Sequence, residues 1–99
     1  MKYVVMWETR QSTSEETQAR GLQVFSKWSP SEGTDFQQFL GRVDGRGGFA
    51  VVETSDPALV AKDMATFGPF FEFSLYPVLE IAETAGIGME AVQMRAAIS

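Results

Sequence analysis

The sequence has 99 residues, of which 44% are hydrophobic, and it carries thirteen acidic residues against eight basic ones. A chain of this length forms one domain with a modest core, and its apolar content excludes an intrinsically disordered protein. Basic residues that are scattered under a net charge of −5 disfavour nucleic-acid binding, and the lack of any cysteine or histidine removes the usual thiol nucleophile, zinc ligands and haem ligand.

We therefore expect a single domain, 1–99, that is cytoplasmic and uses no cofactor and no metal. The N-terminus does not have the pattern of a secretory signal. The sequence also holds no stretch of about 18 apolar residues, the length that would predict a membrane span.

The first predicted element is a strand, Tyr3–Glu8, that is apolar on both faces, as a central strand covered on both sides would be. A helix is predicted over Glu15–Trp28, with Ser14 as its N-cap and an apolar stripe that includes Leu22 and Phe25. Gly21 costs roughly 1 kcal/mol inside a helix, which indicates a close approach to the sheet.

A central hairpin follows, with strands predicted at Phe36–Val43 and Phe49–Thr54 and a turn at Asp44–Gly48. The glycines of the turn tolerate positive φ, which a tight connection between twisted strands requires. A glycine-rich phosphate loop is the alternative interpretation. Such loops normally run from a strand into a helix N-terminus, whereas this one joins two strands, so turn chemistry is favoured.

The second helix is predicted at Pro57–Phe67, capped by Asp56 or Ser55 and ended by Gly68 as its C′ residue. The last strand is predicted at Phe70–Ile81 from its alternation of apolar and polar residues.

Pro77 lies inside that last strand and cannot donate to a strand ladder, which indicates a sheet edge or a bulge. A tail helix is predicted at Thr84–Ser99. Its apolar stripe is expected to pack on the same chain or on a partner, and it consists of Ile87, Ala91, Met94 and Ile98.

The predicted order β-α-β-β-α-β with right-handed crossovers gives an α+β, ferredoxin-like antiparallel sheet in the order 4-1-3-2, followed by a C-terminal helix. Two helices can cover only one face of this sheet. A second copy or the tail helix must cover the other face, because large exposed apolar patches are rare on monomers. We therefore expect a homodimer.

Three stretches, Lys2–Trp7, Phe39–Thr54 and Phe70–Pro77, resemble a family of short bacterial proteins catalogued only as a domain of unknown function. The resemblance extends to Ala82. It implies the dimeric α/β-barrel type of ferredoxin-like protein, in which two sheets pack across a two-fold axis, and it implies no activity. The wider group includes cofactor-independent monooxygenases, haem-degrading enzymes and small-molecule isomerases. Its haem branch relies on an axial histidine, which this chain lacks.

The predicted ligand site is a pocket at the sheet between strands 1 and 3 and the first helix, bounded by Trp7, Phe25, Arg42 and Glu53. Small residues such as Ala50 would leave the necessary volume, and the pocket would suit an aromatic or acidic small molecule. The plainer interpretation is that the aromatic residues form the core, that Arg42 pairs with a nearby glutamate, and that Glu53 is exposed.

Two classes of function are compatible with the sequence. The first is a homodimeric module that binds a small molecule or a partner protein. The alternative is a cofactor-independent enzyme, monooxygenase- or isomerase-like, acting on a small apolar or aromatic molecule with Arg42, Glu53 or Tyr76 as polar groups. The sequence assigns no catalytic residue.

Overall fold

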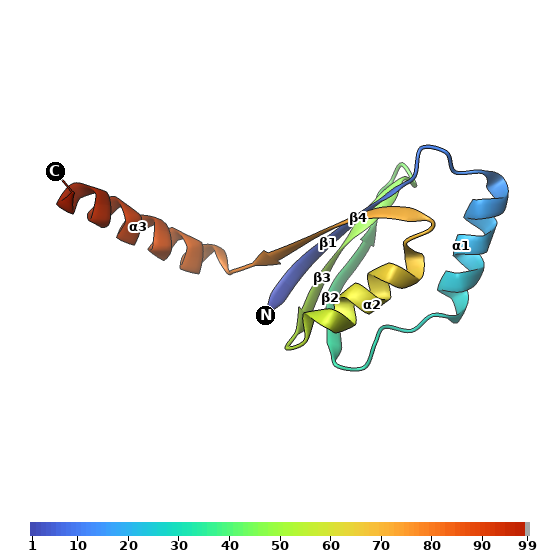
Figure 1. Cartoon of the computed structure of the whole chain (residues 1–99), viewed down its shortest axis with the longest axis horizontal. Coiled ribbons are helices and arrows are strands. Elements are labelled where there is room, and N and C mark those ends of the chain that lie inside the picture. The colour runs from blue at the N-terminus through green and yellow to red at the C-terminus, as the bar shows by residue number, and fades with distance from the viewer. Residues whose placement is uncertain (99) are drawn as a thin grey trace.

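The computed structural model describes residues 1–98, and its elements follow the predicted order (Figure 1). In chain order they are β1 (Lys2–Thr9), α1 (Glu15–Lys27), β2 (Thr34–Gly41), β3 (Gly47–Thr54), α2 (Pro57–Phe67), β4 (Phe71–Val78) and α3 (Ile81–Ala97). The predicted N-caps form: Ser14 Oγ accepts a hydrogen bond from the Thr17 N–H, and the Asp56 carboxylate accepts one from the Ala58 N–H. The predicted end of the tail helix at Ser99 lies outside the described residues.

The four strands form one antiparallel sheet in the order β2-β3-β1-β4, which is the predicted 4-1-3-2 order read from the other edge. The α+β, ferredoxin-like topology is therefore confirmed. β4 lies at an edge, as Pro77 indicated. A proline has no N–H to donate, and on an edge strand that position can face away from the neighbouring strand, so no ladder hydrogen bond is lost.

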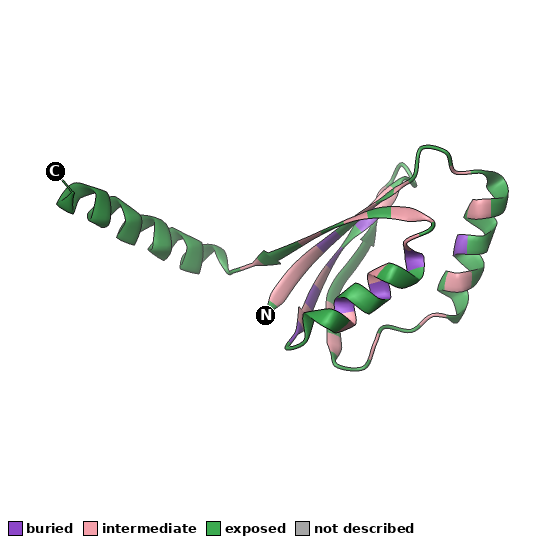
Figure 2. Ribbon diagram, viewed as in Figure 1, coloured by how far each residue is buried: buried purple, intermediate pink, exposed green. Residues whose placement is uncertain are grey.

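Helices α1 and α2 lie on the same face of the sheet and contact each other through aromatic rings. The ring of Phe67 in α2 is 6.2 Å from that of Phe25 and 5.3 Å from that of Trp28, centre to centre. Burial is concentrated between α2 and the two central strands (Figure 2). The core cluster consists of Val5, Ala50, Val52 and Val60.

The other face of the sheet is open. The β1–β3 register places Met6 opposite Phe49 and Val4 opposite Val51 on this face, because successive side chains of a strand point to opposite sides. Met6 is 38% exposed and Phe49 is 40% exposed. We call the apolar side chains here the open-face patch, and it consists of Val4, Met6, Leu40, Phe49, Val51 and Tyr76.

The hairpin differs from the prediction in where its turn begins. β2 ends at Gly41 rather than Val43, and the Arg42 N–H donates to the Gly47 carbonyl while the Arg42 carbonyl accepts from Gly45. Arg42 therefore starts the turn instead of lying in a strand. Gly45 has φ +73°, which confirms that the turn requires a glycine there. A bulge at Gln37 also interrupts the pairing of β2 with β3.

Gly21 does mark a close approach, but to a side chain that precedes β4 and not to the sheet as predicted. A Cβ on Gly21 would lie 3.3 Å from Cγ of Phe70, the residue that precedes β4. Helix α2 ends at Phe67 as predicted, but Gly68 is its C-cap and not its C′ residue. This residue caps α2 with right-handed φ and ψ of −52° and −38°, so the helix ends without a left-handed glycine.

The last strand and the tail helix also have different limits from those predicted. β4 ends at Val78, directly after Pro77, and α3 begins at Ile81 with Glu80 as its N-cap. Ile81 is therefore helical and not part of the strand. The Glu80 carbonyl accepts hydrogen bonds from the N–H groups of Glu83 and Thr84, which starts the helix earlier than Thr84.

Helix α3 projects away from the sheet and its two covering helices (Figure 1). The radius of gyration is 17.7 Å, against roughly 13 Å for a compact chain of this length, and no residue of α3 within the described chain is buried. Of the two alternatives expected for the tail helix, packing on its own chain is therefore excluded for the described residues, and packing on a partner stays a prediction. None of the helices within residues 1–98 is long and apolar enough to cross a membrane.

Candidate functional site

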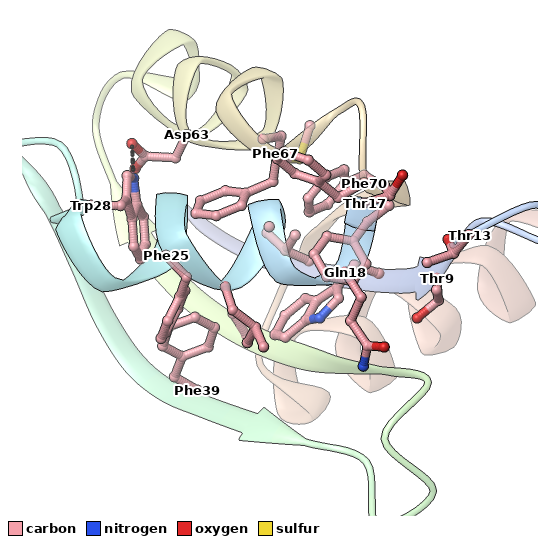
Figure 3. Close-up of a pocket in the computed structure, with 18 of the residues that line it drawn as sticks. Thr9, Thr13, Thr17, Gln18, Phe25, Trp28, Phe39, Asp63, Phe67 and Phe70 are labelled. Atoms are coloured by element: carbon pink, nitrogen blue, oxygen red, sulfur yellow. Dashed lines mark hydrogen bonds between the residues drawn. The ribbon is translucent and has the colours of Figure 1, made fainter. Parts of the chain in front are cut away.

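A cavity of about 320 Å³ lies between the helix-covered face of the sheet and helices α1 and α2 (Figure 3). Small-molecule sites in proteins have volumes of about 300–1,000 Å³, so this cavity suits a small ligand. All four strands and both covering helices contribute to its lining, which is mostly apolar.

The cavity is deep over the central strand β3, because β3 carries small residues on the face that the helices cover. Ala50 is buried there, between the larger side chains of β1 and β2. A Cβ on Gly48 would overlap Cζ2 of Trp7, so the Trp7 indole lies directly against the β3 backbone. The volume exists over Ala50, whose methyl group does not fill it, whereas the Trp7 indole occupies the space over Gly48.

Aromatic rings form one end of the cavity and most of its walls. The ring of Phe25 lies 5.9 Å from Trp28 and 6.0 Å from Phe39, and Trp7 lies 5.5 Å from Phe39 in an edge-to-face arrangement. These separations are within the range of roughly 4.5–7 Å at which aromatic pairs attract. On α1, Phe25 is 49% exposed and Leu22 is 65% exposed, so the cavity opens to solvent beside this helix.

The opposite end of the cavity is polar. Thr9, Thr13, Thr17 and Gln18 gather there, from the end of β1, the following loop and the first turns of α1 (Figure 3). The hydroxyl of Thr9 donates to the Arg46 carbonyl at 3.2 Å.

Hydrogen bonds from threonine hydroxyls also hold the loop between β1 and α1. The Thr13 hydroxyl donates to the Arg10 carbonyl at 2.8 Å, and the Thr17 hydroxyl shares a hydrogen bond with Ser14 Oγ at 3.0 Å. These bonds fix the positions of the hydroxyl oxygens at this end.

Asp63 of α2 is the only charged side chain in the described lining, and it is buried. Its carboxylate accepts hydrogen bonds from the N–H and the hydroxyl of Ser31, at 3.1 and 2.8 Å, and from the indole N–H of Trp28 at 3.4 Å. Asp63 thus attaches the loop after α1 to α2 beside the aromatic end of the cavity.

The structure does not bring the five predicted ligand-binding residues together. Trp7 and Phe25 line the cavity. Glu53 and Tyr76 lie on the open side of the sheet, where Tyr76 is 52% exposed opposite Val4. Arg42 lies at the hairpin turn.

The cause of this separation is the pairing of the strands. Trp7 pairs with Gly48, so Gly48 and Ala50 share its face, whereas Glu53 is an odd number of residues away from both and points to the other side.

Arg42 and Glu53 make ion pairs on the open side of the sheet. Arg42 bonds Glu8 of β1 at 2.9 Å and also bonds Asp44 in the turn, so it attaches the turn to the central strand. The hydrogen bond that Arg42 donates to Glu8, followed by the one that it donates to Asp44, raises the pKa of Arg42. The Arg46 N–H and the Arg42 guanidinium lower the pKa of Asp44. Glu53 pairs with the amino terminus at 2.9 Å.

Sequence reasoning missed the polar residues of the cavity. Asp63 had a usable signal, since it lies one helical turn after Val60 and before Phe67, and so occupies the apolar stripe of α2. Gln18 had a similar signal, since it lies one helical turn before Leu22 on α1. Thr9 and Thr13 had none, because a polar stretch between a strand and a helix reads as solvent-exposed. Within residues 1–98, no group of three metal-ligating side chains is placed to hold a metal ion.

The fold and the cavity define an α+β domain of ferredoxin-like topology whose ligand-sized cavity lies between the sheet and its helices. The chain belongs to the family described as Domain of unknown function (DUF3303), whose model matches residues 1–92. The match spans all four strands and most of α3, and so extends ten residues beyond Ala82, where the resemblance found from the sequence ended. No curated protein matches the chain.

Proposed function

We propose that this protein is a homodimeric module that binds a small, largely apolar or aromatic molecule in the cavity between the sheet and helices α1 and α2. The observation that carries this proposal is a cavity of about 320 Å³ with an aromatic lining in a domain of only 99 residues. A well-packed domain of this size leaves few voids larger than a water molecule. An unfilled space of this volume therefore indicates a site for a ligand and not a packing defect.

The alternative of a cofactor-independent, monooxygenase- or isomerase-like enzyme has less support from the cavity. Asp63 is its only charged group within the described residues, and three hydrogen bonds already occupy its oxygens. Arg42 and Glu53 are ion-paired on the other side of the sheet. Binding therefore accounts for the cavity better than proton transfer does.

The bacterial source and the cytoplasmic location stay predictions from the sequence.

The homodimeric part of the proposal rests on the open-face patch. Its half-exposed apolar side chains come from all four strands, and they lie together on a surface that α1 and α2 do not cover. Sheet-to-sheet packing of two copies would bury this patch in the manner of a dimeric α/β barrel. The projecting helix α3 carries further exposed apolar residues that a second copy could cover.

Binding is tested with naphthalene, an uncharged two-ring aromatic probe, and with variants of adjacent residues that face opposite sides of β3. Ala50→Leu fills the floor of the cavity, whereas Val51→Leu places the same side chain on the open face. NMR signals of the Trp7 and Trp28 indole N–H groups report on the cavity, because both rings line it.

We expect naphthalene to shift both indole signals in the wild-type protein and in Val51→Leu, and to leave them unshifted in Ala50→Leu. Far-UV circular dichroism verifies that each variant is folded. Saturable shifts that persist in a folded Ala50→Leu protein, or no shift in the wild type, would contradict the proposed site.

A further inference from the structure

The polar end of the cavity has a specific hydrogen-bonding character. The hydroxyls of Thr9 and Thr13 donate to the carbonyls of Arg46 and Arg10. A hydroxyl has one hydrogen to donate and two lone pairs to accept with. Because the hydrogens are already used, these two oxygens offer a ligand only acceptor sites.

Gln18 adds the complementary group. Its side chain lines the same end of the cavity and carries both a carbonyl acceptor and an NH₂ donor. A ligand group that donates one hydrogen bond and accepts another would therefore pair with a threonine hydroxyl and with the Gln18 amide.

The charge around this end disfavours an anionic ligand. Within the described lining no charged side chain lies at this end, because Asp63, the only one that lines the cavity, lies beside the aromatic end and is negative. Arg10 is turned toward the Gly68 carbonyl, to which it donates at 2.8 and 3.1 Å, and toward Glu72. The exposed Arg46 lies outside the lining. A carboxylate would lose its hydration at this end and would meet acceptor oxygens without a cation.

We propose that the cavity selects a neutral aromatic molecule that bears a hydroxyl group, with the ring among Trp7, Phe25 and Phe39 and the hydroxyl against Thr9, Thr13 and Gln18. This inference rests on the proposed function and narrows its ligand class. It replaces the acidic ligand that the sequence suggested, because the arginine invoked for that ligand lies on the other side of the sheet.

Three probes with the same ring system test the inference at pH 7: naphthalene, neutral 2-naphthol and anionic 2-naphthoate. Their dissociation constants are measured from the Trp7 and Trp28 indole signals. We expect 2-naphthol to bind about tenfold more tightly than naphthalene, the gain of a well-paired hydrogen bond, and 2-naphthoate to bind no more tightly than naphthalene.

Matched threonine variants locate the hydroxyl. Thr13→Val and Thr9→Val keep the volume and remove the acceptor, so each should reduce the preference for 2-naphthol over naphthalene. Thr13→Ser restores a hydroxyl and should restore the preference. Thr66→Val is the control, because Thr66 is exposed on α2 and its hydroxyl also donates to a backbone carbonyl, that of Lys62.

The outcomes separate this inference from the proposed function. If naphthalene binds but 2-naphthol has no advantage, or 2-naphthoate binds most tightly, the hydroxyl inference is overturned and the aromatic site stands. An advantage that persists in both folded Thr→Val variants overturns it as well. If none of the three probes shifts the indole signals, both proposals fail.

Discussion

Two glycines that face each other across β2 and β3 have opposite surroundings. Gly48 is buried, and a Cβ there would overlap the Leu40 carbonyl oxygen and Cζ2 of Trp7. Gly41, its partner, has no atom within 4 Å of the Cβ position among the described residues. Gly48 therefore leaves room for the Trp7 ring that lines the cavity, whereas Gly41 borders open space.

We predict that Gly48→Ala lowers the free energy of unfolding by about 1–3 kcal/mol, since the added methyl group forces Trp7 and the neighbouring backbone to move. Gly41→Ala is the matched control and should change stability by no more than about 0.5 kcal/mol. Urea denaturation followed by tryptophan fluorescence measures both. Equal effects of the two substitutions would contradict the close packing of Trp7 on β3.

At the scale of elements, helix α1 is joined to the domain through its loops more than through packing on the sheet, whereas α2 packs on the central strands. Within α1 only Gly21 is buried among the described residues, and Phe25 and Leu22 remain half-exposed or more. The end of α1 is held instead by Asp63 of α2, which bonds Ser31 and Trp28. Asp63 therefore sets the width of the aromatic end of the cavity.

We predict that Asp63→Ala costs about 2–3 kcal/mol of stability, because the Ser31 N–H and the Trp28 indole N–H lose a charged acceptor in a partly buried setting. Asp35→Ala, on the exposed side of β2, is the control and should be close to neutral. Thermal unfolding compares the two. A loss of similar size in both variants would show that Asp63 is not a specific attachment for the loop.

For the whole molecule, the uncovered surfaces are the open-face patch and helix α3. The exposed apolar residues of α3 include Ile87, Met89 and Met94, and no part of the described chain covers them. Burial of apolar surface is the main favourable term in association, so we expect a second copy to cover both surfaces.

We predict that light scattering gives the mass of two subunits at micromolar concentration. Phe49→Glu should reduce it to one subunit, because the new charge would be buried in the interface without a partner. Deletion from Ala85 onward should weaken or abolish the dimer while the sheet keeps its cooperative unfolding, since α3 packs on no part of its own described chain.

The control for this prediction is Val43→Glu, which introduces the same charge at a fully exposed residue in the hairpin turn. It should leave the mass at two subunits. A wild-type protein with the mass of one subunit would contradict the dimer. A deletion variant that remains a dimer would exclude α3 from the interface.

The sequence by itself determined the order of elements, the strand order and the edge position of β4. Those features follow from local signals: the spacing of apolar residues, the caps Ser14 and Asp56, the glycine turn and Pro77. The handedness of crossover connections then leaves few topologies for four strands and two helices.

Only the tertiary structure decided which residues share the cavity. Alternation along a strand sorts its residues into two faces, but the pairing between strands decides which face of β3 joins Trp7. A shift of that pairing by one residue would bring the opposite face of β3 to Trp7. The bulge at Gln37 and the turn that begins at Arg42 set that pairing for β2. Arg42 and Glu53 therefore lie away from Trp7 and Phe25, while Asp63 and the threonines meet the cavity through contacts between residues distant in the chain.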